Sequence, residues 1–171
     1  MCGKKPYFPL FVDISKKKIV VIGGGKVAER RVETLLNFSD DITVISPKVT
    51  EGIRKRVTEE KVSWIPDAIR MERGRSIEKA IEWFSEYADM VFAATDNSTC
   101  NEQLVRICRE QGILVNASHK KELCDFYFPA VVVKDGVTVG ITSGGEDHAQ
   151  AKKIREQIEA MLLEQDIEYT L

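Results

Sequence analysis

The chain has 171 residues, of which 43% are hydrophobic and 30% are charged, and its formal net charge is −2 at pH 7. This size and composition predict a soluble globular domain with a buried core rather than a disordered chain. The small negative charge gives no overall attraction to nucleic acid or anionic lipid, and no apolar stretch approaches the roughly 20 residues of a membrane span, so we expect neither a nucleic acid nor a membrane as a partner.

The first residues and the cysteines indicate a cytoplasmic protein. Met1–Pro6 does not lead into an apolar segment with a cleavage site, as a secretory signal would. The four cysteines, Cys2, Cys100, Cys108 and Cys124, form no Cys-x-x-Cys pair and are too few for a disulfide scaffold. We therefore expect reduced thiols in the cytoplasm.

The first part of the chain alternates between strand and helix patterns. The short apolar run Pro9–Ile14 is predicted as a strand, followed by a solvated turn at Ser15–Lys18. Ile19–Ile22 is apolar throughout, which is typical of a strand buried on both faces of a parallel sheet. Apolar residues at helical spacing then predict a helix from Lys26 to about Phe38, and Ile42–Ser46 completes a β-α-β unit.

The same alternation continues to Asn116. Further segments are predicted in chain order: a helix at Thr50–Glu60, a strand at Val62–Ile65, a helix at Ile77–Tyr87, a strand at Met90–Thr95, a helix at Thr99–Gln111 ended by Gly112, and a strand at Ile113–Asn116. Strands that alternate with helices predict an α/β fold, a Rossmann-like, doubly wound parallel sheet.

A different pattern begins after Asn116. Two β-branched runs, Ala130–Val133 and Val137–Thr142, flank Lys134-Asp135-Gly136, and Asp-Gly between such runs is a strong hairpin signal. A last helix is predicted after Gly145, with one apolar face formed by Ala151, Ile154, Ile158, Met161 and Leu162. We therefore expect three regions: the sheet domain over 1–116, a hairpin unit over 117–147, and a C-terminal helical segment over 148–171.

The turn Gly23-Gly24-Gly25-Lys26-Val27-Ala28 fits the pattern G-x-G-x-x-G/A. The first glycine allows a tight turn from strand to helix, and the second lets backbone N–H groups approach a pyrophosphate at the positive end of the helix dipole. The pattern alone is weak, but here it joins a buried strand to an amphipathic helix inside a β-α-β unit. It therefore predicts a dinucleotide site on Gly23, Gly24 and Gly25.

The residues after the second strand leave the choice of dinucleotide open. An NAD site usually carries Asp or Glu about 20 residues after the glycines, whereas this chain has Ser46-Pro47-Lys48 there. Ser46 could bind a ribose hydroxyl, and Lys48 could tolerate a 2′-phosphate. On this chemistry alone, both NAD and NADP remain open.

A further polar segment ends the strand predicted at Met90–Thr95. Strand ends beside a glycine turn line the crevice in which such sheets bind ligands. The small Ala93-Ala94 pair leaves room for a cofactor, and Thr95-Asp96-Asn97 offers hydrogen bonds. Asp96 or Ser98 could also cap the following helix, and the two roles are compatible.

Four segments together resemble the precorrin-2 dehydrogenase family of the siroheme-synthase N-terminal type. They are I-G-G-G-K-V-A-E-R-R at Ile22–Arg31, A-A-T-D at Ala93–Asp96 with Asn101, F-Y-F-P-A at Phe126–Ala130, and S-G-G at Ser143–Gly145. The resemblance extends from about Tyr7 to Glu159. A generic Rossmann protein would not carry this set.

The resemblance implies an oxidoreductase of sirohaem (porphyrin) biosynthesis that uses NAD to oxidise precorrin-2 to sirohydrochlorin. Some members are also ferrochelatases, lyases that insert ferrous iron into sirohydrochlorin. The resemblance further implies a homodimer, in which the region after the sheet forms the dimer contact and part of the tetrapyrrole cleft. It favours NAD over NADP, with Lys26, Val27, Pro47 and Lys48 lying where the family contacts the cofactor.

One departure from the family falls on a catalytic position. The family carries an aspartate, its candidate for acid–base work, where this chain has His119, in a register fixed by Asn116 and Phe126. A histidine can accept the proton that dehydrogenation releases, and an imidazole is also a good iron ligand. His119 could instead be a solvated loop residue. Asp125 is a second candidate, which could equally order the loop before Phe126.

The last part of the chain adds weaker signals. Ser143 and the two glycines after it could hold an acetate or propionate of the tetrapyrrole through their N–H groups, or form a hinge. Glu146, Asp147 and His148 favour the start of a helix over a metal site, so no resident metal is expected. The C-terminal helical region is shorter than in the family, which makes chelation less expected than dehydrogenation.

Two other functions fit the same residues. A Rossmann domain without catalysis could report the NAD state to a partner, although such a regulatory module needs neither the F-Y-F-P segment nor the hairpin. A scaffold could bind and hand over a tetrapyrrole without oxidising it, which the missing aspartate keeps open.

Overall fold

The computed structural model describes residues 6–67 and 86–168. Two units are distinguished by their internal contacts: one is Asp13–Phe126, and the other combines the N-terminal residues up to Val12 with those from Tyr127 onward. The boundary falls after Phe126 rather than after Asn116, because the loop between them hydrogen-bonds back to the sheet. The side-chain amide of Asn116, for example, donates to the carbonyl oxygen of Phe126 at 2.7 Å.

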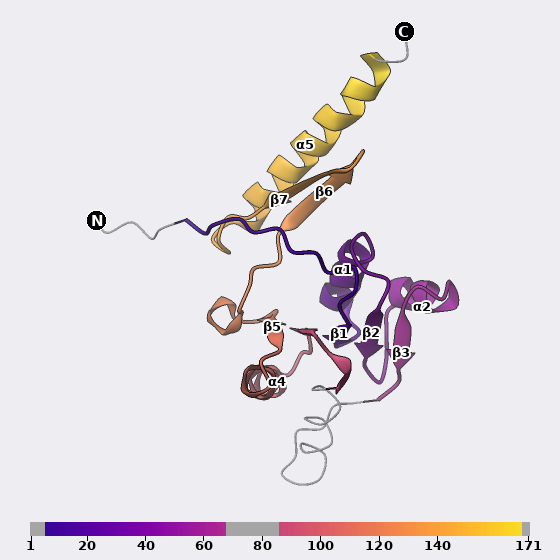
Figure 1. Cartoon of the computed structure of the whole chain (residues 1–171), viewed down its shortest axis with the longest axis vertical. Coiled ribbons are helices and arrows are strands. Elements are labelled where there is room, and N and C mark those ends of the chain that lie inside the picture. Colours follow the sequence, from indigo (N-terminus) through magenta and orange to yellow (C-terminus); the bar gives the residue numbers. More distant parts are fainter. Residues whose placement is uncertain (1–5, 68–85, 169–171) are drawn as a thin grey trace, which may run out of the picture. The chain divides into compact units, whose positions relative to one another are not determined.

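A parallel sheet of five strands forms the centre of the first unit, in the order β3-β2-β1-β4-β5 (Figure 1). The strands are β1 (Ile19–Ile22), β2 (Ile42–Ile45), β3 (Ser63–Ile65), β4 (Met90–Ala93) and β5 (Leu114–Ala117). The chain moves outward from β1 to β3 and then returns to the other side of β1 for β4. Ligands bind at the carboxyl ends of the strands where the order reverses in this way.

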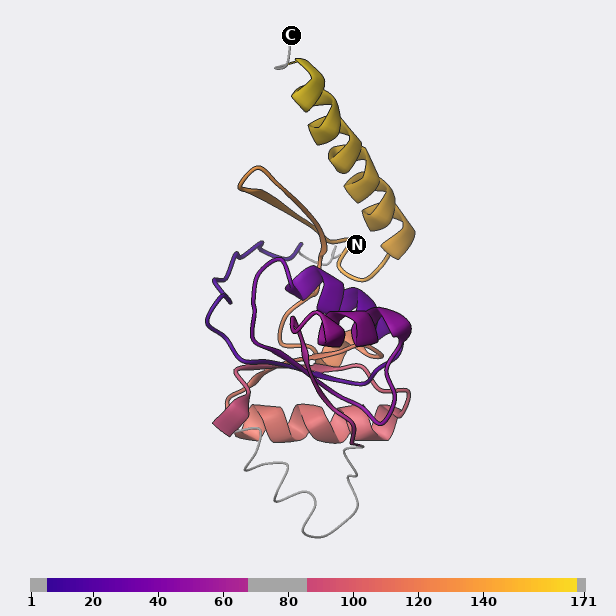
Figure 2. The ribbon, with the colours of Figure 1, turned by 90° about the vertical axis from the view of Figure 1, so that its right-hand side faces the viewer.

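Helices cover both faces of this sheet (Figure 2): α1 (Lys26–Leu35) and α2 (Glu51–Thr58) on one face, and α4 (Ser98–Glu110) on the other. β1 and β4 are buried along their whole length, as their apolar sequences require. Leu104 and Ile107 of α4 pack with Val91 and Val115 of the sheet. The expected α/β, Rossmann-like fold is confirmed.

Backbone and side-chain hydrogen bonds close the carboxyl end of α1. The helix stops at Leu35 rather than continuing to Phe38. The side-chain amide of Asn37 donates to the carbonyl oxygens of Glu33 and Thr34 at 3.3 and 3.0 Å, which satisfies carbonyl groups that a longer helix would pair with backbone N–H groups.

Asn97 caps the amino end of α4, where its side-chain oxygen accepts a hydrogen bond from the N–H of Cys100 at 2.9 Å. The alternative role considered for Asp96 and Ser98, as the cap of this helix, is therefore taken by Asn97. Gly112 follows the end of α4 with a φ of +70°, as its predicted role as a helix stop requires.

One predicted strand is wrong and one predicted helix is outside the described residues. Pro9–Ile14 forms no strand with the described residues, and Phe8, Leu10 and Phe11 are 87%, 76% and 69% exposed. An apolar run indicates burial but cannot show whether a neighbouring strand will pair with it. The helix predicted at Ile77–Tyr87 falls almost entirely within 68–85, which the structure does not describe.

The second unit contains the expected hairpin and last helix. β6 (Ala130–Lys134) and β7 (Val137–Ile141) pair antiparallel, and Asp135 and Gly136 between them have φ of +51° and +79°. Positive φ at both central residues is what a type I′ hairpin turn needs. α5 (His148–Glu168) packs on β6. Within residues 6–67 and 86–168, no helix is both long and apolar enough to cross a membrane.

Candidate functional site

The glycine turn between β1 and α1 lies against two neighbouring segments. Gly23 has a φ of +121°, and a Cβ there would lie 2.3 Å from the carbonyl oxygen of Ala94. A Cβ at Gly24 would lie 2.0 Å from the carbonyl oxygen of Lys48. Both positions therefore need glycine. Gly25 differs, because nothing lies within 4 Å of a Cβ built there.

The open space at Gly25 adjoins the amino end of α1. Gly25 is the N-cap of this helix and supplies no side-chain hydrogen bond to its first turn. The N–H groups of a first turn carry the positive end of the helix dipole, and they suit an anion such as a diphosphate. The turn therefore fits the diphosphate of a dinucleotide.

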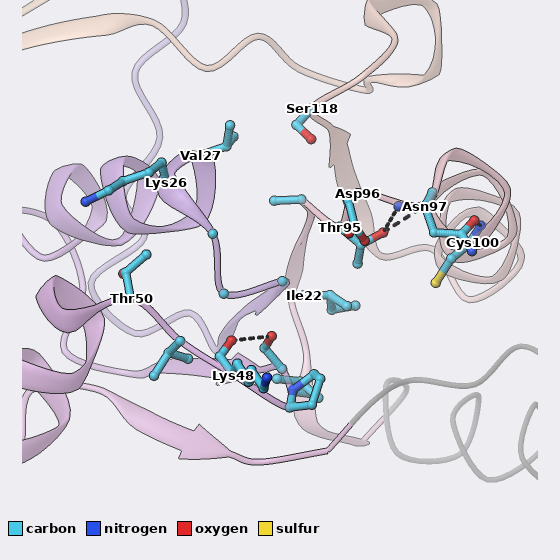
Figure 3. Close-up of a pocket in the computed structure, with 18 of the residues that line it drawn as sticks. Ile22, Lys26, Val27, Lys48, Thr50, Thr95, Asp96, Asn97, Cys100 and Ser118 are labelled. Carbon is cyan, nitrogen blue, oxygen red and sulfur yellow. Dashed lines mark hydrogen bonds between the residues drawn. The ribbon is translucent and has the colours of Figure 1, made fainter.

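A cleft of about 1050 Å³ opens at this turn, along the carboxyl ends of the strands (Figure 3). Every residue that the sequence predicted for cofactor binding lines it: Gly23, Gly24, Gly25, Lys26, Val27, Ser46, Pro47, Lys48, Ala94, Thr95 and Asp96. The volume is at the upper end of those typical of ligand pockets, as a dinucleotide requires.

The same cleft has lining residues that the sequence did not indicate: Ile22, Ile45, Val49, Thr50, Asp67, Thr99, Cys100, Gln103 and Ser118. Asp67 and Ser118 follow β3 and β5, so the parallel topology was a usable signal for both. Thr99, Cys100 and Gln103 lie at the start of α4, and no sequence pattern marked them.

Hydrogen bonds fix the segment after β2. The Ser46 hydroxyl donates to the carbonyl oxygen of Lys48 at 2.7 Å, and the Trp64 indole N–H donates to the carbonyl oxygen of Ser46 at 2.9 Å. The Ser46 oxygen can still accept a hydrogen bond from a ligand hydroxyl. The Lys48 side chain is exposed, and Asp67 brings a carboxylate to the β3 side of the cleft.

Glu29 partly balances the positive charge at the amino end of α1. Its Oε2 lies 3.1 Å from Nζ of Lys26. Hydrogen bonds from the Thr50 hydroxyl and from Lys26 lower the pKa of the Glu29 carboxyl. Because the backbone N–H of Thr50 also donates to the carbonyl oxygen of Gly24 at 3.0 Å, these contacts connect the start of α2 to the glycine turn.

Asn101 links the segment after β4 to the segment after β5. It is fully buried in α4, its Oδ1 accepts from the Thr95 hydroxyl at 2.7 Å, and its Nδ2 donates to the carbonyl oxygen of Thr95 at 3.0 Å. The same Nδ2 lies 3.4 Å from Nδ1 of His119. His119 is exposed and directly follows Ser118, but it is not itself a lining residue.

Asp125 and Ser143, the other predicted catalytic residues, take part in local structure. Oδ1 of Asp125 accepts from Nε of Arg109, and Oδ2 accepts from the N–H of Val115, each at 3.0 Å. These bonds support the alternative in which Asp125 orders its loop. Ser143 belongs to the second unit, where its hydroxyl accepts from the N–H of Asp147 at 3.0 Å.

The segment before α5 begins a helix, as expected, because Oδ1 of Asp147 accepts from the N–H of Gln150 at 2.8 Å. Across the part of the chain that the structure describes, no group of three or more His, Cys, Asp and Glu side chains is arranged to hold a metal ion. Among the described residues, Cys100, Cys108 and Cys124 are not joined in disulfide bonds. Burial raises the pKa of Cys108 to about 12, so this thiol stays protonated.

The parallel sheet, the reversal between β1 and β4, and the glycine turn define an α/β dinucleotide-binding domain. Residues 10–130 match the family described as "Putative NAD(P)-binding", and the chain belongs to this NAD(P)-binding family.

Several relatives are similar over most of this chain but are much longer. The chain is 33% identical over 157 residues to the "Probable multifunctional siroheme biosynthesis protein HemA" of Ruminiclostridium josui, covering 88% of this chain and 27% of that protein. It is 32% identical over 156 residues to the "Siroheme synthase" of Nitrosococcus oceani, covering 91% and 31%. The chain thus spans less than a third of the length of these relatives.

A solved structure described as "SirC, precorrin-2 dehydrogenase" is similar in fold. Its TM-score is 0.69, and the match covers 90% of this chain and 70% of that one. At 18% sequence identity, the match shows a shared fold.

Proposed function

We propose that this chain is a cytoplasmic, NAD-dependent dehydrogenase that oxidises precorrin-2 to sirohydrochlorin in sirohaem biosynthesis. The observation that carries the proposal is the open space at Gly25, at the amino end of α1 and inside a cleft lined by the strand ends. The names of similar proteins, siroheme synthases by sequence and a precorrin-2 dehydrogenase by fold, support the choice of substrate.

Different residues of the cleft would bind different parts of the dinucleotide. The N–H groups of Gly24–Val27 would bind the diphosphate. Ser46 and Lys48 would contact the adenosine ribose, and Thr95 and Asp96 would face the nicotinamide half, because they follow β4 on the other side of the reversal. When bound, the nicotinamide supplies the hydride acceptor for the oxidation.

We propose NAD rather than NADP as the physiological dinucleotide. Asp67 supports this choice, because a carboxylate beside the ribose accepts hydrogen bonds from hydroxyls and repels a 2′-phosphate. The exposed ammonium of Lys48 has the opposite effect, because it attracts a 2′-phosphate and so favours NADP. We therefore expect NAD to bind more tightly than NADP by a modest factor.

Dehydrogenation also releases a proton, which a side chain or water takes up. His119 is the candidate for a substrate contact on this side, because it follows Ser118 at the cleft. For Asp125 we propose an ordering role through Arg109. The N–H groups after Ser143 are proposed to bind an acetate or propionate group of the tetrapyrrole.

We also propose a homodimer that forms through the second unit. Among the side chains that the structure describes in the hairpin and α5, five apolar ones are more than a third exposed: Val133, Val137, Ile154, Met161 and Leu163. We propose that these side chains contribute to one apolar surface in the dimer, as is typical of protein interfaces. Sedimentation equilibrium of the wild type is expected to give the mass of a dimer, and Met161→Lys a shift toward monomer. A wild type that stays monomeric at all concentrations contradicts this proposal.

The experiment that tests the activity is anaerobic mixing of the chain with precorrin-2 and NAD while the absorption spectrum is recorded. We expect NADH and sirohydrochlorin to appear together. NAD binding without turnover would favour a regulatory NAD-binding module, and tetrapyrrole binding without turnover would favour a scaffold. Ferrous iron insertion is tested separately, by adding ferrous ion as the second substrate to sirohydrochlorin and following the spectrum of sirohaem.

A further inference from the structure

The side-chain amide of Asn101 is held in one orientation by the backbone of Thr95. Oδ1 of Asn101 accepts from the N–H of Thr95 at 3.3 Å as well as from its hydroxyl, and Nδ2 donates to the carbonyl oxygen of Thr95. A backbone N–H can only donate and a carbonyl oxygen can only accept. Exchanging the amide oxygen and nitrogen would therefore set donor against donor and acceptor against acceptor, in a fully buried side chain.

The fixed amide turns a donor toward His119. An amide nitrogen carries two hydrogens, and Nδ2 of Asn101 uses one for the carbonyl oxygen of Thr95. The other faces Nδ1 of His119 at 3.4 Å. In a neutral imidazole one nitrogen is a donor and the other an acceptor, so Nδ1, which meets a donor, must be the acceptor. The ring proton of neutral His119 then resides on Nε2.

We propose that Asn101 is a positioning residue that holds His119 in its Nε2–H form, so that His119 offers a hydrogen-bond donor rather than a base to a carboxylate of the substrate. The identity of that substrate rests on the proposed function above, whereas the state of the ring does not. Acting as a base through Nδ1 would require His119 to give up its contact with Asn101. In this arrangement the proton released by the oxidation goes to water.

The chain suits a direct measurement of this state, because it contains only two histidines, His119 and His148. With His148→Gln as background, the two ring nitrogens of His119 can be observed by 15N NMR at about pH 8.5, where an ordinary histidine is neutral. No dinucleotide or tetrapyrrole is needed, so failure of this inference is separable from failure of the proposed function. We expect Nε2 to be protonated and Nδ1 to be unprotonated. A proton on Nδ1, or an even mixture of the two forms, overturns the proposal.

Two substitutions test whether Asn101 is the cause. Asn101→Asp replaces the donor by an acceptor, and the proton of His119 should move to Nδ1. Thr95→Val is the matched control, because it removes the hydroxyl but leaves the backbone groups that orient the amide, and His119 should keep its proton on Nε2. An unchanged ring in a folded Asn101→Asp variant overturns the proposal. The wild-type spectrum remains a test if that variant does not fold.

Steady-state kinetics then distinguishes two roles for His119, a hydrogen-bond donor to the substrate and a base that takes its proton. His119→Gln keeps an N–H donor, and we expect the KM for precorrin-2 to rise by less than about 3-fold. His119→Asp keeps a base but adds a negative charge, and the KM should rise by about 10-fold or more, as expected when a hydrogen bond to a charged group is lost. A larger loss of kcat in His119→Gln than in His119→Asp would show that His119 is a base and would overturn the proposal.

Discussion

The backbone of Gly23 packs directly against the carbonyl oxygen of Ala94, so that a Cβ on Gly23 would lie 2.3 Å from it. Gly23 also has a φ of +121°, a backbone conformation that residues other than glycine rarely adopt. β1 and β4 therefore meet at the strand reversal through a backbone contact with no room for a side chain. The shape of the turn is fixed by packing before any ligand binds.

Gly23→Ala should consequently destabilise the fold itself. We expect the free energy of unfolding to fall by about 2–4 kcal/mol, because backbone strain and a steric clash act together. Urea denaturation followed by circular dichroism measures this change. Gly112→Ala is the matched control: Gly112 has a φ of +70° but nothing within 4 Å of a built Cβ, so only the strain remains, at about 1 kcal/mol. Equal decreases in the free energy of unfolding of the two variants would contradict a steric clash at Gly23.

Gly25→Ala should separate ligand binding from folding. Its Cβ would enter open space, and the φ of −84° at Gly25 is accessible to alanine. Stability should change by less than about 1 kcal/mol, while the affinity for NAD should fall by about 10-fold or more, because the methyl group occupies the space proposed for the diphosphate. Isothermal titration calorimetry with NAD checks this. An unchanged affinity would mean that the diphosphate does not bind at Gly25.

Most of the sheet was predictable because its signals are local. Ile19–Ile22 is a continuous apolar run, the helix that begins at Lys26 has an apolar face at helical spacing, and the glycines between them indicate the turn. The strand predicted at Pro9–Ile14 was wrong because an apolar run does not reveal whether a partner strand exists. Strand pairing is decided by the rest of the fold.

The candidate site was predictable where its residues adjoin a motif or follow a strand of the parallel sheet. Asp67 follows β3, so the topology could have indicated it, whereas Gln103 lies on α4 and no sequence pattern marked it. The contact between Asn101 and His119 joins a buried helix residue to a residue beyond the next strand. No spacing in the sequence encodes such a contact, since it depends on how α4 packs on the sheet.

Lys48→Glu should increase the preference for NAD over NADP. The exposed ammonium of Lys48 attracts a 2′-phosphate, and a carboxylate in its place would repel one. We expect NADP affinity to fall by about 10-fold or more and NAD affinity to change by less than about 3-fold, with a smaller difference at high salt. Lys55→Glu on α2 makes the same change in net charge but is not among the cleft residues. A similar decrease in NADP affinity in both variants would indicate a long-range charge effect.

Glu29 should make the stability of the fold depend on pH in the acidic range. Its pKa in the folded chain is lowered, first by the Thr50 hydroxyl and then by Lys26, below the value of about 4.3 in an unfolded chain. The carboxylate therefore contributes stability above about pH 4.3, and this contribution is lost as the pH falls through the folded-state pKa. Urea denaturation between about pH 2.5 and 6 should show a smaller acid-induced loss in Glu29→Gln than in the wild type. An identical pH dependence would exclude this contribution.

Asp125 and Arg109 should behave as one structural unit. Asp125 accepts hydrogen bonds from Arg109 and from the N–H of Val115, so each single variant, Asp125→Asn and Arg109→Met, should lower the free energy of unfolding by about 1–2 kcal/mol. The double variant should lose less than the sum of the two, because both changes break the same ion pair.

Steady-state turnover with precorrin-2 then distinguishes the two roles considered for Asp125. If the carboxylate orders the loop, both single variants should reduce turnover to a similar extent. If it takes the proton, Asp125→Asn should lose turnover while Arg109→Met retains it, because only the first substitution removes the base.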